Sequence, residues 1–157
     1  MRTPTVDDRI FLQQFENCTL RFHNWTHRAH VKVAYLYLRR FSLDEAIARM
    51  RTGIQRYNTA NDVPDGPATG YNETTTQAFM RIIHAVMSEY ESVFPTETAD
   101  EFCDTHPQLL RKHILRLSYS PDQRTHPDAG TKFVEPDLAP LPQARRRSEA
   151  QRNRKNK

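Results

Sequence analysis

The sequence predicts an all-α domain, an irregular bundle of about five helices with an extended, proline-rich C-terminal strap. In several stretches apolar residues recur every three or four positions, which is the spacing of one helix face. Ser42 and Glu45 form a capping box directly ahead of such a stretch, and this pair is a typical helix start. No segment forms a credible sheet pattern, and no internal repeat is present.

The expected elements alternate with clear breaks. Helices are expected at about 5–18, 25–40, 42–57, 73–94 and 107–117, with short helical turns near 98–103 and 120–122. Residues 58–70 are rich in Asn, Asp, Gly and Pro, so we interpret them as a long loop and a candidate lid or binding loop. Gly53 lies inside the third helix, where glycine costs about 1 kcal/mol relative to alanine, and therefore indicates close packing. Residues 133–142 would strap onto the helices.

The basic charge of the chain is concentrated at its C-terminal end. Residues 144–157 hold seven Lys or Arg and one Glu, whereas the net charge of the whole chain is +4, so residues 1–143 sum to −2. We therefore interpret 1–143 as a single folded domain and 144–157 as a disordered basic tail. A nucleic-acid-binding domain should have a basic folded surface. Nucleic acid is thus expected to bind weakly and only through the tail, unless the tail is simply a solvated terminus.

The expected compartment and partners follow from missing signals. The N-terminus has no apolar signal-peptide core, and no apolar run reaches the 18 or so residues that cross a bilayer. Cys18 and Cys103 are too few for a disulfide framework. We expect a cytoplasmic protein with reduced thiols, a small-molecule substrate and no membrane partner. The sequence leaves a homodimer open.

The residues best suited to chemistry begin in the segment Trp25-Thr26-His27-Arg28-Ala29-His30. His27 and His30 are about one helical turn apart and can face one cavity. Two histidines and a carboxylate can bind iron, zinc or manganese with open coordination positions. Glu73, at the expected start of the fourth helix, is the natural third ligand. Glu16, near the end of the first helix, would be a fourth ligand or hydrogen-bond an imidazole.

Three interpretations of these residues stay open. With a metal, His27, His30 and Glu73 bind an ion that acts as a Lewis acid or activates water. Without a metal, one histidine is the general base and Glu73 orients it. In the third interpretation, the residues form a buried polar network that fixes helix register in a non-catalytic accessory or interaction module. Phosphate-loop, GxSxG, HExxH and paired-cysteine motifs are absent from the sequence, which excludes several common enzyme classes.

Four further residues are expected to bind substrate in the same cavity: Trp25, Tyr71, Asn72 and His84. His84 follows Glu73 by eleven residues, about three helical turns, and so would lie on a similar face. Trp25, just ahead of the second helix, would also pack as a hydrophobic staple. The cavity would lie between the second and fourth helices, with the 58–70 loop as its cover.

Five phrases of the chain form a distinctive pattern over about residues 10–142. They are Phe15-Glu16-x-Cys18-Thr19-Leu20, Trp25-Thr26-His27-x-x-His30, Arg56-Tyr57-Asn58, Gly70-Tyr71-Asn72-Glu73-Thr74 and the proline-rich run at 133–142. The pattern resembles a family of small, largely uncharacterised microbial helical proteins.

This resemblance implies that His27, His30 and Glu73 belong to the family pattern and that Asn72 stands where the family has a histidine. Because asparagine is a poor ligand for zinc or iron, the change implies either an altered metal site or a position that orients substrate. We therefore expect a small-molecule enzyme, with the metal-dependent and metal-free versions both open.

Overall fold

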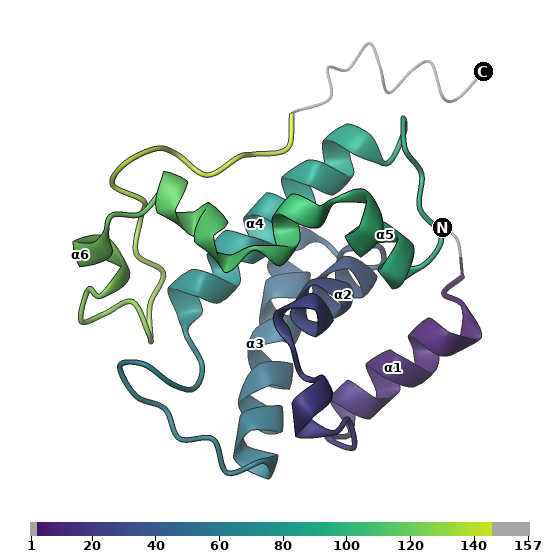
Figure 1. Cartoon of the computed structure of the whole chain (residues 1–157), viewed down its shortest axis with the longest axis horizontal. Helices are drawn as coiled ribbons and strands as arrows, with labels where there is room; N and C mark the ends of the chain where they lie inside the picture. Colours follow the sequence, from purple (N-terminus) through teal and green to yellow (C-terminus); the bar gives the residue numbers. More distant parts are fainter. Residues whose placement is uncertain (1–2, 146–157) are drawn as a thin grey trace.

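The computed structural model of the chain describes residues 3–145. It is a bundle of α1 (Val6–Glu16), α2 (His27–Leu38), α3 (Leu43–Ala60), α4 (Glu73–Tyr90), α5 (Ala99–Thr105) and the short α6 (Pro121–Arg124), as Figure 1 shows. Three 3₁₀ helices complete it: η1 (Phe22–Asn24), η2 (Pro107–Leu110) and η3 (Lys112–Leu117). Since the described part contains helices and no strand, the predicted all-α class is confirmed.

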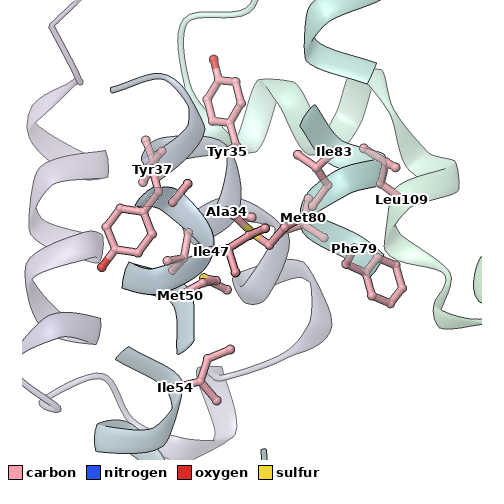
Figure 2. Close-up of a cluster of buried hydrophobic side chains, with 14 of the residues drawn as sticks. Ala34, Tyr35, Tyr37, Ile47, Met50, Ile54, Phe79, Met80, Ile83 and Leu109 are labelled. Atoms are coloured by element: carbon pink, nitrogen blue, oxygen red, sulfur yellow. The ribbon is translucent and has the colours of Figure 1, made fainter. Parts of the chain in front are cut away.

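Helix α2 is the centre of the bundle. It packs against α1, α3, α4 and α5 (Figure 1), and seven of its twelve residues are buried. Figure 2 shows Ala34 of α2, Met50 of α3 and Met80 of α4 lying together between the three helices. A helix that is apolar nearly all round belongs inside a domain, so the sequence of α2 dictates this central place.

Side-chain caps set the starts of the helices. Each cap oxygen accepts a hydrogen bond from the backbone N–H three residues further on, and the capping residues are Thr5, Thr26, Ser42, Asn72, Thr98 and Ser120. These are residue types that favour the N-cap position. Because Thr26 is a cap, α2 begins at His27, two residues later than predicted. Because α3 continues to Ala60, the loop before α4 is 61–72 rather than 58–70.

The segment after Pro107 differs from the prediction of a single α-helix. It forms η2 and η3, separated by Arg111 in an extended conformation with φ −103° and ψ 110°. Next to this break, the carbonyl group of Leu109 meets His27 of α2. Beside the break, a backbone carbonyl therefore accepts a hydrogen bond from a side chain of the central helix α2.

The proline-rich segment 133–142 runs as an extended strap along the bundle, in yellow-green and yellow in Figure 1. The Val134 N–H donates to Thr74 Oγ1 at 3.1 Å, and the Tyr119 hydroxyl donates to the Val134 carbonyl at 2.8 Å. The strap thus ties the start of α4 to the segment that follows η3. The predicted basic tail lies outside the described residues from position 146 onward. Among the helices of residues 3–145, none has the length and apolar character needed to cross a membrane.

Gly53 lies where α3 crosses α1. A methyl group added to it would come within 2.7 Å of the ring of Phe15, which is completely buried. The predicted close packing at this glycine is therefore confirmed.

We expect Gly53→Ala to lower the free energy of unfolding by about 1–3 kcal/mol, because overpacking against Phe15 outweighs the gain in helix propensity of about 1 kcal/mol. Urea denaturation measures the change. Gly130→Ala is the control, since no atom of the described residues, apart from Gly130 and its chain neighbours, lies within 4 Å of the added methyl group. If the Gly53→Ala protein were more stable than wild type, α1 could move away from α3 at little cost in free energy.

Candidate functional site

A partly open cavity of about 370 Å³ lies between α2, α3, α4 and η3. Its walls are mainly apolar and include Ala34, Ile54, Phe79 and Ile83, all labelled in Figure 2. The volume is at the small end of the range of roughly 300–1,000 Å³ found for small-molecule pockets. The cavity therefore suits a compact ligand with an apolar body.

His27 and His30 line this cavity, with ring centroids 6.5 Å apart. His27 Nε2 lies 2.9 Å from the Leu109 carbonyl oxygen, and His30 Nδ1 lies 2.7 Å from the Thr26 carbonyl oxygen. Because a carbonyl oxygen only accepts, these two nitrogens carry the protons and donate. In the neutral rings, His27 Nδ1 and His30 Nε2 therefore keep lone pairs, and no residue of the described part donates a hydrogen bond to either.

Burial favours the neutral form of both rings. Desolvation lowers the pKa of His30 to about 4, and the hydrogen bond to Thr26 offsets only part of this effect. Desolvation also lowers the pKa of His27, against the hydrogen bond to Leu109. The charge of nearby Lys112 lowers both pKa values further. At neutral pH both histidines are thus hydrogen-bond acceptors that can take up a proton.

Trp25 packs against the ring of His30 and limits how that ring can turn. Its indole stacks on His30, with ring centroids 3.8 Å apart, and on Phe15, with centroids 4.6 Å apart. Trp25 directly precedes the cap of α2 and His30 is the fourth helical residue, so the pair has the arrangement of the predicted hydrophobic staple. Trp25 is not among the residues that line the cavity, so it does not share the predicted place of His27 and His30 there.

Glu73 lies outside this cavity and is bound by neighbours of its own. Arg51 Nε donates to its two carboxylate oxygens at 3.1 and 3.0 Å, Arg51 Nη2 and the Tyr71 hydroxyl also donate, and Gln77 Nε2 donates at 2.8 Å. Burial alone would raise the pKa of Glu73, but the hydrogen bonds from Arg51, Tyr71 and Gln77 outweigh it and lower the pKa to about 2. The carboxylate is therefore ionised at neutral pH and is a weak base, and both of its oxygens accept hydrogen bonds.

The predicted grouping of Glu73 with His27 and His30 is not formed. Glu16, the predicted fourth ligand, accepts a hydrogen bond from the Tyr37 hydroxyl at 3.0 Å and lines a separate hollow beside α1. Within residues 3–145, no three His, Cys, Asp or Glu side chains are grouped in a way that could hold a metal ion. The predicted ligand set does not fit a metal, and each histidine is oriented by a backbone carbonyl rather than by Glu73.

The other predicted substrate-binding residues are divided among three cavities. His84 lines a hollow under the strap, so its predicted place beside the histidines is wrong. Tyr71 and Glu73 line a second, wider cavity of about 840 Å³ on the other side of the start of α4. Asn72 lines both this cavity and the histidine cavity. The prediction failed for His84 because it placed Glu73 in the histidine cavity, which is lined instead by other residues of α4, such as Phe79 and Ile83.

Two cations at the edge of the histidine cavity were missed by the sequence analysis. Lys112 of η3 and Arg124 of α6 line it, both are exposed, and neither forms an ion pair with any residue between 3 and 145. Among the described residues 3–145, no Asp or Glu lines the cavity. Only the tertiary fold brings these two residues to α2, so no local sequence signal marks them.

Comparisons of the chain with protein-family models, with curated proteins and with solved structures found no match.

We expect Glu73→Gln to lower the free energy of unfolding by about 2 kcal/mol at pH 7, because Arg51 loses its anion and an amide N–H replaces an acceptor. The Arg51 side chain is 37% exposed, so solvent recovers part of the larger cost of a fully buried pair. Glu45→Gln is the matched control, since its ion pair with Arg49 is exposed and should change stability by less than about 0.5 kcal/mol. Thermal and urea denaturation measure both. If Glu73→Gln were as stable as wild type, Glu73 would belong to a functional site rather than to the framework.

The burial of His30 predicts a specific acid sensitivity. The ordinary pKa of 6.5 applies in the unfolded chain, and the folded value is about 4. The unfolded state then binds more protons between these values, so stability is complete above pH 6.5 and falls as the pH drops toward 4. We expect His30→Gln to remove at most about 2 kcal/mol of the loss between pH 7 and pH 5. Urea denaturation at both pH values measures this. The control is His113→Gln at an exposed position, and an equal effect of both variants would contradict the assignment.

Proposed function

We propose that the protein is a small-molecule enzyme in which His27 acts as a general base inside the 370 Å³ cavity. The observation that carries the proposal is the pair of neutral histidines, each with one lone pair left free by a backbone hydrogen bond to the other nitrogen. A base for proton transfer must be unprotonated at working pH and within reach of the substrate. The lowered pKa values and the position of both rings at the wall of an apolar cavity support this role.

The two histidines suit different roles. A base with a pKa of about 4, as for His30, is weak at neutral pH, so His30 serves better as a hydrogen-bond acceptor that orients substrate. His27 takes the proton on Nδ1, while its Nε2–H continues to donate to Leu109. The Leu109 carbonyl raises the pKa of His27 and so stabilises the imidazolium that forms. The proton then returns to the product, which leaves the ring in its starting tautomer.

The non-catalytic helical module remains the second candidate, and the Glu73 network is the observation that favours it. Arg51 of α3, Tyr71 of the loop and Gln77 of α4 all donate to one carboxylate. Such a network fixes the position of helices without any need for a ligand. It lies in the second cavity, away from the two free lone pairs, so it accounts for Glu73 and leaves His27 and His30 unexplained.

The test is untargeted mass spectrometry of a metabolite extract incubated with the protein. We expect a compound that wild type converts with time, and we expect His27→Asn to lose at least about 100-fold of that rate, the usual contribution of a general base. His113→Asn is the control, because this histidine is exposed and does not line the cavity. No conversion by wild type, or equal conversion by His27→Asn, would contradict the proposal.

A further inference from the structure

The charged side chains that line the histidine cavity are positive. Lys112 and Arg124 line its edge without ionic partners among residues 3–145, and the lining includes no carboxylate. The remaining polar groups are the two histidines, three threonines, Asn72 and Tyr119. Arg124 also lines the second cavity, where Glu73 is already paired with Arg51. Inside the histidine cavity, an anion would meet two cations and no carboxylate of the described lining residues, whereas a cation would meet repulsion.

The geometry points to a carboxylate as the anion: we infer that the substrate is a small monocarboxylic acid whose apolar body fills the cavity and whose carboxylate binds Lys112 and Arg124. This inference rests on the proposed function of the same cavity. Lysine and arginine are the side chains that form charge-assisted hydrogen bonds with carboxylates, and arginine can bind both oxygens at once.

The start of α4 argues for a carboxylate over a phosphate. Phosphate sites at helix starts depend on free backbone N–H groups. Here the N–H of Glu73 donates to the Gly130 carbonyl at 3.0 Å, and that of Thr74 donates to the Ala129 carbonyl at 3.0 Å. The N–H groups of Thr75 and Thr76 donate to the side chain and the carbonyl of Asn72, at 2.8 and 3.0 Å. With these backbone donors occupied, a phosphate would lack the N–H groups that such sites use, whereas Lys112 and Arg124 can bind the two oxygens of a carboxylate.

The apolar walls set the rest of the ligand. Ala34, Ile54, Phe79 and Ile83 come from three helices and leave a space suited to a short alkyl chain or one ring. Each methylene group buried against these walls should tighten binding by about fourfold. A carboxylate near the histidines also raises their pKa values, because the negative charge opposes the effects of desolvation and Lys112. The substrate would thereby make His27 a stronger base.

Titration calorimetry at low salt can test this with linear carboxylates from butanoate to decanoate and the primary amides of equal length. We expect one or more carboxylates to bind at least about tenfold more tightly than the matched amide, the effect of a charged hydrogen bond. The variant Lys112→Gln/Arg124→Gln should lose about tenfold or more in carboxylate affinity. The control Arg116→Gln/Lys132→Gln makes the same change in net charge at exposed residues outside the cavity and should bind normally.

Nitrogen NMR of the imidazole rings places the ligand. The bound carboxylate should raise the pKa of His30 by about half a unit or more, and the amide should not. Equal binding of amides and carboxylates, equal loss in the two double variants, or no binding by any carboxylate would overturn the inference. These outcomes are distinct from failure of the proposed function. Normal carboxylate binding with unchanged turnover in His27→Asn would reject the general base alone, whereas loss of turnover in His27→Asn with a neutral substrate would reject the carboxylate alone.

Discussion

The Glu73 carboxylate joins α3, α4 and the loop between them, and the shape of the site depends on this junction. Arg51 holds it from α3, Tyr71 from the loop and Gln77 from one turn further along α4. A buried carboxylate is costly unless its oxygens are satisfied, and here donors on three segments meet that need. The junction sets the position of the first turn of α4, whose threonines line the histidine cavity.

The first turn of α4 also lies between two cavities, one lined by an ion pair and the other mainly by apolar residues. On one side, the wide cavity holds the ionised pair of Arg51 and Glu73. On the other side, apolar walls desolvate His27 and His30 and keep them neutral. Had Glu73 faced the histidines, its charge would have raised their pKa values whether or not a substrate was bound. By pairing with Arg51, Glu73 leaves the histidines available as bases.

The parts of the structure that depend on local sequence were predictable, and the parts that depend on helix rotation were not. Thr5 and Ser42 cap helices because their oxygens reach an N–H three residues away, which spacing alone reveals. The bond from His30 to the carbonyl of Thr26 is equally local. Spacing also placed both histidines on one cavity. The partner of Glu73 lies 22 residues away on α3, and no periodicity indicates that pairing. For the same reason, sequence spacing did not indicate that Lys112 and Arg124 lie at the histidine cavity.

Asn72 shows how one position can serve both the framework and the site. The resemblance noted in the sequence implies a histidine here, and the substitution suggested an altered ligand or a substrate contact. In the structure, the Asn72 side chain caps α4 by accepting from the N–H of Thr75 at 2.8 Å, and Asn is among the strongest N-cap residues while histidine is not. Asn72 also lines the cavity of His27 and His30. Because the cap occupies its oxygen, the amide nitrogen of Asn72 is the group left to donate a hydrogen bond to a ligand in the cavity that His27 and His30 also line.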